Sequence, residues 1–419
     1  MRLLLDKSYI YQFLFFLCIG VSYLENFELI YSVWAFVFLM TLKKSYSLKI
    51  IHYISYFVII LLIGILVMLF KEYKIFYIFR DFTYMTKPIF GFFIGYQICK
   101  NNFNQTFKTL VYTGFIIACI HLGALADGIV FHNARTVNDF RYAGGFFSDF
   151  EVYTLIILIF HDKFEIGLSA KRLRLITLII GFSSFMYLAR TNFIQFVILF
   201  VAMKGYFKIN KTSIMVVSSV VVFVIVGYSA ILSINPKRSG PGIEALLYKI
   251  KIAPMEAFKT KIDRNNWKDF NDNYRSYENI CTVKQITRNG ILSILFGEGL
   301  GSKIDLKQEV QLRDMKLRYI SILHNGFMTV FLKSGLIGIV IYLFSIYVLF
   351  KQKKSKIPII QNINLLLLGT GVFLIFSNWV FLGVYNKLDN KSILIGLLFC
   401  YIEMMNKKSS SALETNQEL

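Results

Sequence analysis

The sequence predicts an all-α polytopic membrane protein, and three observations lead to this fold class. Hydrophobic residues make up 56% of the 419 residues and charged residues only 17%, against roughly 25% charged residues in ordinary soluble domains. Apolar runs of about 20 residues, the length needed to cross the hydrocarbon core, recur along the chain. The basic residues fall between these runs. We therefore expect one membrane domain instead of several soluble ones.

The apolar runs predict about twelve transmembrane helices. Those expected within residues 1–234 are 8–24, 27–42, 50–70, 75–98, 107–126, 148–161, 173–190, 191–203 and 213–234. Those expected within residues 324–405 are 326–350, 358–383 and 391–405. Residues 173–203 could also form one long kinked element, but we expect two helices that meet at Arg190. The polar tail, residues 406–419, is expected to be disordered.

The positions of lysine and arginine predict the orientation, because short basic loops stay on the cytoplasmic side. With the N-terminus inside, the basic loops 43–49, 163–174, 204–211 and 351–356 are all cytoplasmic. Both termini then lie in the cytoplasm. The loop 127–147, the Arg190 junction and the polar stretch 235–323 share the external face.

The net charge of +21 raises the question of nucleic-acid binding. The basic residues separate apolar segments and do not form one basic face, so we expect no nucleic-acid partner. Five scattered cysteines indicate neither a disulfide framework nor a zinc site. Arg2 and Lys7 precede an apolar run, but no small-residue cleavage site follows, so this run is expected to stay as the first helix.

The polar stretch 235–323 is expected to be a folded external cap. Apolar spacing predicts helices at 243–252 and 273–288, and Pro236, Pro241 and Pro254 are expected to act as breaks. Gly297, Gly299 and Gly301 resemble half of a dinucleotide fingerprint. They lack a βαβ context and a Walker-type lysine, so they predict a tight turn.

Several charged residues are candidate site residues. Arg190 lies between two apolar runs, where an arginine is costly unless it faces a cavity or partner; snorkelling to the interface is the alternative. Arg275 and Arg288 lie in the predicted 273–288 helix, where a plain surface position is equally compatible with Arg275.

His324 and Asn325 stand at the start of a predicted helix, where an anion can bind free N–H groups and the macrodipole disfavours imidazolium. Helix capping is the alternative interpretation of this pair. Asp149 and Glu151 could hold a divalent metal, but two carboxylates alone make a poor site, so we expect neither metal nor cofactor.

Together these motifs resemble the O-antigen polymerase and O-antigen ligase superfamily, which are integral membrane glycosyltransferases of the GT-C type. The similarity covers roughly residues 140–345 and consists of several motifs in the family's order. They are the stretch Arg141-Tyr142-Ala143-Gly144-Gly145 before a mid-chain helix, Arg190 between two helices, Arg275 at the start of the loop helix, the turn with Gly297, Gly299 and Gly301, and His324-Asn325-Gly326 followed by Gly335-Leu336-Ile337-Gly338.

The resemblance implies an enzyme of the bacterial inner membrane whose active site faces the periplasm. Its donor would be an oligosaccharide linked to undecaprenyl pyrophosphate. Arg190 and Arg275, with Arg288 in reserve, would stabilise the leaving pyrophosphate. His324 would take the proton from the acceptor hydroxyl and so give inversion without a metal. Arg141, Asn325, Gly297, Gly299 and Gly301 would bind substrate or support the site.

The expected reaction is polymerisation, in which a growing glycan is transferred to the incoming lipid-linked repeat unit. Ligation of a finished glycan to lipid A core uses the same donor chemistry and stays open. A lipid-linked oligosaccharide flippase is the alternative from another class, and it would have short loops and charges at mid-membrane. Besides membrane lipids, the resemblance implies a chain-length regulator and a flippase as partners.

Overall fold

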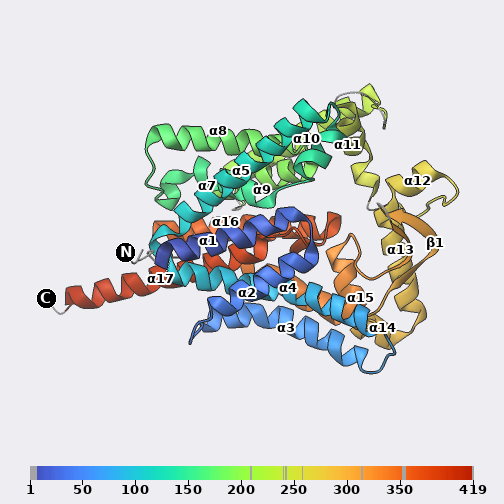
Figure 1. Ribbon diagram of the computed structural model, residues 1–419, viewed down its shortest axis with the longest axis horizontal. Coiled ribbons are helices and arrows are strands. Elements are labelled where there is room, and N and C mark those ends of the chain that lie inside the picture. The colour runs from blue at the N-terminus through green and yellow to red at the C-terminus, as the bar shows by residue number, and fades with distance from the viewer. Residues whose placement is uncertain are drawn as a thin grey trace.

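The computed structural model describes residues 7–207, 210–238, 240, 243–256, 258–312, 315–351 and 355–417. It shows a helical protein with one short β-hairpin (Figure 1). Helices α12 (Trp267–Asp272) and α13 (Tyr274–Arg288) and strand β1 (Ile304–Leu312) gather at one end, while α17 (Lys391–Gln417) ends at the opposite end (Figure 1). The helical fold class is confirmed, and the hairpin was not expected.

The helices of the first 234 residues follow the predicted apolar segments, with α6 added. They are α1 (Lys7–Gly20), α2 (Phe27–Met40), α3 (Leu48–Met68), α4 (Ile75–Asn101), α5 (Thr106–Phe131), α6 (Val137–Gly144), α7 (Asp149–Ile159), α8 (Ala170–Met186), α9 (Arg190–Met203) and α10 (Lys211–Ile234), with 3-10 turns η1 (Val21–Leu24), η2 (Phe103–Gln105) and η3 (His161–Phe164). A break at residues 187–189 separates α8 from α9, and Leu188 there has a left-handed φ of 48°. The two-helix interpretation of this region is therefore correct.

The two helices predicted in the polar stretch 235–323 are present as α11 (Glu244–Glu256) and α13, while α12 and α14 (Ile291–Phe296) were not predicted. Pro254 lies inside α11, so the break predicted there is wrong, and Pro241 lies outside the described residues. Strands β1 and β2 (Met315–Ile320) then form an antiparallel hairpin in which Ile304 pairs with Ile320. The end of α11 is tied to α13 by the Ser276 hydroxyl, which donates to the Glu256 carbonyl at 3.1 Å.

The C-terminal helices are α15 (Gly326–Phe350), α16 (Pro358–Val380) and α17, with the turn η4 (Gly383–Tyr385) before α17. The disorder predicted for the tail is wrong for the part that the structure describes, because α17 continues to Gln417. Glu403 and Lys407 are one turn apart and pair at 2.8 Å, an arrangement that favours continuation of the helix.

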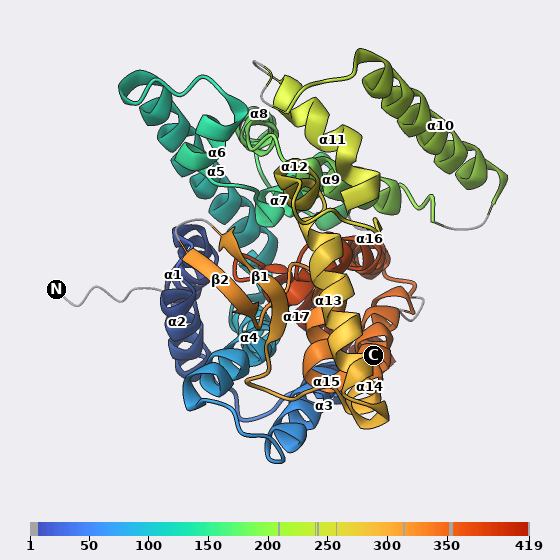
Figure 2. The same cartoon turned by 90° about the vertical axis from the view of Figure 1, so that its right-hand side faces the viewer.

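The helices form two groups joined by α16 (Figures 1 and 2). Helices α5 to α11 lie on one side, and α1 to α4 lie on the other with α14, α15 and α17. The closest packing joins α4 to α17 through small residues. A Cβ on Gly95 would lie 1.9 Å from the Ile393 carbonyl oxygen, and one on Gly396 would lie 2.0 Å from the Phe92 oxygen. Only glycine permits this approach, as is common between membrane helices.

A buried charge network lies where α4, α7 and α17 meet. Lys391 Nζ is 3.0 Å from Asp149 Oδ2 and also pairs with Asp389. Lys87 Nζ donates to the carbonyl oxygens of Asn386 at 3.0 Å and Asp389 at 2.8 Å. Buried ions require such partners, because an unpaired one would cost several kcal/mol. Asp149, considered above as a metal ligand, is thus paired with a lysine.

Among the described residues, six helical segments are long and apolar enough to cross a membrane, which supports a multi-pass membrane protein. They are α1 with η1, α3, η2 with α5, α10, α15 and α16. Helices α6 and α7 meet at 90° and would make a seventh crossing if they count as one broken span. The prediction of twelve crossings with a GT-C architecture stays a prediction.

Candidate functional site

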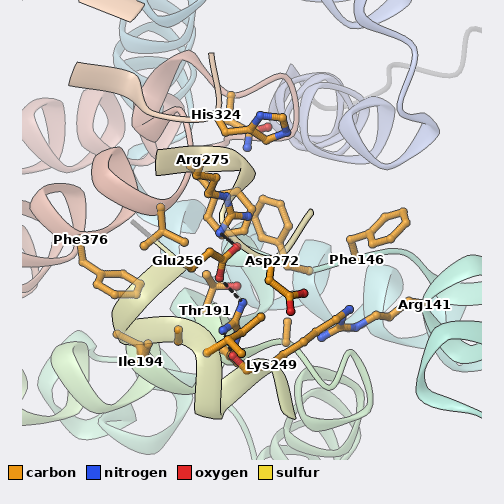
Figure 3. A pocket seen from close by; sticks show the side chains of 18 of the residues that line it. Arg141, Phe146, Thr191, Ile194, Lys249, Glu256, Asp272, Arg275, His324 and Phe376 are labelled. Atoms are coloured by element: carbon orange, nitrogen blue, oxygen red, sulfur yellow. Dashed lines mark hydrogen bonds and ion pairs between the residues drawn. The ribbon is translucent and has the colours of Figure 1, made fainter. Parts of the chain in front are cut away.

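A cavity of about 580 Å³ lies where α11, α12 and α13 cover the start of α9 and the end of α16. One face of α11 forms a wall, because its lining residues Ala245, Tyr248, Lys249, Ile252, Ala253 and Glu256 recur three or four positions apart. Figure 3 shows His324 and Arg275 on one side of the cavity, Arg141 and Lys249 on the other, and Glu256 between them. The predicted residues Arg141, Arg190, Arg275 and His324 all line this one cavity.

Glu256 joins the two arginines that the sequence singled out. Its Oε1 lies 2.8 Å from Arg275 Nη1, and its Oε2 lies 3.2 Å from Arg190 Nη2. The dashed lines in Figure 3 mark both contacts. Two guanidinium groups that share one carboxylate retain a net positive charge. A bound phosphate could therefore accept hydrogen bonds from their remaining N–H groups.

Arg275 is held in a partly apolar setting. Its guanidinium lies 5.3 Å from the centre of the Phe381 ring, in a cation–π contact. Burial lowers the pKa of Arg275 below its usual value, and the nearby Arg190 charge acts in the same direction. The Glu256 carboxylate opposes this shift. Arginine stays charged under such conditions, so the cavity contains a cation whose charge is little screened by water.

Lys249 adds a third cation, which the sequence had not indicated. Burial and the charges of Arg141 and Arg190 lower the pKa of Lys249 to about 8. Arg190 also donates to the Lys249 carbonyl oxygen, which fixes α11 against the start of α9. Cations placed this close repel each other, and an anionic ligand would relieve that repulsion.

The charge of the cavity favours anions. Among the described lining residues, six are basic (Arg141, Arg190, Arg238, Lys249, Arg275 and Lys387) and three are acidic (Glu25, Glu256 and Asp272), which leaves a net charge of +3 with His324 neutral. Helix α9 also begins at this cavity, and its N-cap residue Ala189 provides no side-chain cap. The N–H groups of the first turn of a helix are suited to binding a phosphate oxygen.

His324 is paired with Glu278, a residue that the sequence analysis did not select. Its Nδ1 lies 3.0 Å from Glu278 Oε1, and its backbone N–H donates to Glu278 Oε2 at 3.0 Å. The His324 side chain is 45% exposed and the Glu278 side chain 1% exposed. An ionised carboxylate only accepts hydrogen bonds, so the proton of a neutral His324 lies on Nδ1, and the Nε2 lone pair is available.

Asn325 caps a helix, which confirms the capping interpretation for this residue of the His-Asn pair. Its Oδ1 accepts the Met328 N–H at 3.1 Å and so begins α15. His324 precedes this cap, and its ring contacts Glu278 instead of the helix backbone. Within the described residues, the lining of the cavity includes His324 but not Asn325. We therefore assign Asn325 a structural role.

Arg141 reaches the cavity from α6. Its Nη2 donates to the carbonyl oxygen of Leu188, the residue with a left-handed backbone just before α9. Arg141 Nε is buried and has no hydrogen-bond partner among the described residues. Arg141 therefore supports the α8–α9 junction and keeps hydrogen-bonding capacity for a ligand.

The structure does not bring Arg288 to the cavity, so its predicted role in pyrophosphate binding is not supported. Arg275 and Arg288 stand at opposite ends of α13, and a separation of thirteen residues at 1.5 Å per residue is about 20 Å. Arg288 is exposed to solvent. The sequence placed both arginines on one helix but could not show which end of that helix faces the site.

The glycine motif forms the predicted tight turn but serves packing. Gly297, Gly299 and Gly301 have φ values of 78°, 79° and 88°. A Cβ on Gly297 would lie 2.6 Å from the backbone nitrogen of Gly335, where α15 is kinked with φ 66°. A Cβ on Gly299 would lie 2.6 Å from the Met68 nitrogen of α3. Gly297 and Gly299 hold this turn against α15 and α3, and none of the three glycines belongs to the described lining of the cavity.

Glu278 and Glu256 were missed for different reasons. Glu278 is three residues after Arg275, so the two lie on the same side of α13, and this spacing was visible in the sequence. Glu256 gave no comparable signal, because its role depends on how α11 packs across α9 and α13.

Comparisons with protein-family models, curated proteins and solved structures returned no match for this chain. The resemblance to the O-antigen polymerase and ligase superfamily therefore rests on the motifs given above.

Proposed function

We propose that this chain is a membrane glycosyltransferase that polymerises a surface glycan, using donors linked to a polyprenyl pyrophosphate. One observation carries the proposal: Arg190, Arg275 and His324, selected from the sequence alone, line a single cavity. Residues chosen for leaving-group binding and for proton removal are thus in reach of one bound substrate. The net positive charge of the lining supports an anionic leaving group.

Different residues of the cavity stabilise the leaving group and remove the proton. The acceptor hydroxyl oxygen forms a bond to the anomeric carbon, while the bond from that carbon to the phosphate oxygen breaks and its electron pair leaves with the pyrophosphate. Arg190 and Arg275, with Lys249, stabilise that developing charge. The hydroxyl proton passes to Nε2 of His324, and attack opposite the leaving group inverts the anomeric centre.

Glu278 supports His324 as a positioning residue. It fixes the ring by accepting from Nδ1 and stabilises the imidazolium once the proton has been transferred. The second contact, from the His324 backbone N–H to the same carboxylate, holds the chain at the start of α15. The base is thereby set before substrate binds.

The test is the length of the surface glycan on a gel from cells that lack this protein and are complemented with variants. We expect a ladder with the wild type and with Arg288→Ala, and a single repeat attached to core with His324→Ala and Arg275→Ala. Arg288 is the matched control, because it is an arginine of the same helix outside the cavity. Immunoblots must show equal amounts of each variant in the membrane.

The same gel separates the alternatives. A polymerised glycan that stays unattached in the null strain would indicate a ligase. Single repeats retained on the inner leaflet would indicate a flippase. A ladder with both His324→Ala and Arg275→Ala would refute the proposed site.

A further inference from the structure

A second cavity, of about 1050 Å³, lies beside the first one. Its walls come from α1, η1 and α2 on one side and from α5 and α6 on the other, and Figure 2 shows these two groups of helices facing each other. Most of the wall is apolar, including Leu17, Val21, Leu29, Ile117 and Ile120.

The second cavity has its mouth between two segments that are long and apolar enough to cross a membrane. Leu24 and Ile120 line it and are largely exposed, and they belong to the segments α1 with η1 and η2 with α5, both of which are apolar enough to cross a bilayer. Exposed apolar side chains at such a mouth are stable when lipid covers them. The cavity is therefore open to a ligand that arrives within the bilayer.

The two cavities meet at Arg141. Glu25, Arg141 and Phe146 line both of them. The buried Nε of Arg141 is without a partner in the described part of the chain. Arg141 is near enough to Arg190 and to Lys249 for their charges to interact. The apolar second cavity thus ends at the cation of Arg141, which adjoins the pair Arg190 and Arg275.

The inner wall of the second cavity is held by stacking and hydrogen bonds between three helices. His121 stacks on Tyr187 with ring centres 3.7 Å apart, and its Nδ1 lies 2.8 Å from the Ser183 hydroxyl. The buried Glu151 accepts from both Ser183 and Tyr187. These contacts hold α5, α7 and α8 together and preserve the space without a ligand.

We propose that the second cavity binds the isoprenoid chain of the donor, next to its pyrophosphate, with Arg141 at the neck between lipid and phosphate. This inference rests on the proposed function. It adds that the isoprenoid chain of the bound donor extends from the pyrophosphate into the second cavity. The donor fits better than the acceptor, because a pyrophosphate at Arg141 also reaches Arg190. The pyrophosphate of the acceptor lies a whole repeat unit away from the hydroxyl that reacts at His324.

The test uses the full chain in phospholipid vesicles and a polyprenyl phosphate that carries a photoreactive group on its first isoprene units. Ala124→Phe fills the second cavity, since Ala124 lines it on α5. Ala126→Phe is the matched control, because Ala126 is exposed on the same helix and belongs to the described lining of neither cavity. We expect saturable labelling of α1 and α5 in the wild type and in Ala126→Phe, and at least tenfold less labelling in Ala124→Phe.

A second measurement separates this inference from the proposed function. In transfer assays, Ala124→Phe should raise KM for a long-chain donor about tenfold and leave the rate with a two-isoprene donor unchanged. If Ala124→Phe abolishes the labelling, the lipid site is supported even when the wild type shows no transfer. In that case only the proposed function fails. Labelling that does not saturate, or that is equal in both variants, would overturn the inference.

Discussion

His324 and Glu278 are joined by two hydrogen bonds to one carboxylate, one from the imidazole Nδ1 and one from the backbone N–H, both at 3.0 Å. The pairing fixes the position and the tautomer of the histidine together. Tyr274 packs edge-on against the same ring with centroids 5.7 Å apart. In its proposed role as the base, His324 would need little reorganisation when substrate arrives.

The first prediction concerns Glu278. Glu278→Gln preserves size but cannot stabilise the imidazolium, so we expect kcat to fall on the order of 10²-fold or more with KM nearly unchanged. Single-turnover transfer with saturating donor measures this effect. Thermal unfolding of the variant serves as the control for folding. A wild-type rate in Glu278→Gln would show that His324 acts without this partner.

The second prediction separates charge from geometry at Arg275. Arg275→Lys keeps the positive charge but loses the planar fork that reaches Glu256 and a phosphate together. We expect transfer to slow on the order of 10²-fold. Arg288→Lys, on the same helix, should be indistinguishable from wild type in the same assay. Equal losses in both variants would point to a general effect on α13.

The third prediction is a pH dependence that arises from Lys249. Because burial and two arginines lower the pKa of Lys249 to about 8, the lysine is charged below that pH and neutral above it. Affinity for inorganic pyrophosphate should therefore fall as pH rises through 8. Calorimetry with the protein in nanodiscs, between pH 6.5 and 9.5, measures the change.

Lys249→Arg provides the control for this pH dependence. Arginine stays charged throughout the range, so subtracting its profile removes the ionisation of pyrophosphate itself. Identical profiles for wild type and Lys249→Arg would exclude Lys249 as the titrating group.

The lowered pKa of Lys249 also affects the stability of the fold. Below pH 8 the charged lysine destabilises the folded state, so the free energy of unfolding should rise between pH 8 and 10.5 in the wild type alone.

The fourth prediction concerns the kink of α15. Gly335→Ala places a Cβ 2.4 Å from the Leu295 backbone at a φ of 66°, so we expect a loss of about 2 kcal/mol or more in the free energy of unfolding. Gly227→Ala in α10 is the comparison, since a Cβ there meets no atom within 4 Å. Unfolding in detergent micelles compares the two. Equal stability would mean that the cap does not depend on this close contact.

Most of the fold could be read from apolar length alone, because a span needs about 20 apolar residues whatever its neighbours are. The hairpin was missed although residues 304–306 and 310–312 alternate between apolar and polar, since a short alternating segment in a charged loop resembles ordinary loop sequence. The tail helix was missed because the residues after Met405 are mostly polar, and such a composition occurs both in disordered segments and in exposed helices.

For the candidate site, residues at the junctions next to apolar segments were the easiest to find. Arg190 and His324 lie at the start of helices next to apolar runs, where a polar side chain is conspicuous. Glu256 and Lys249 lie within an ordinary amphipathic helix, and their role follows only from the face that α11 turns toward the cavity. Position along the chain could not supply that information.

The packing of α17 against α4 has a consequence for biosynthesis. Lys87 and Asp149 are inserted early, yet their partners at Asn386, Asp389 and Lys391 are synthesised about 300 and 240 residues later. Chains emerge from the ribosome N-terminus first, at roughly 5–20 residues per second, so these buried charges wait many seconds without partners. The nascent protein is therefore most exposed to quality control and to misassembly until α17 packs against α4 and supplies these partners.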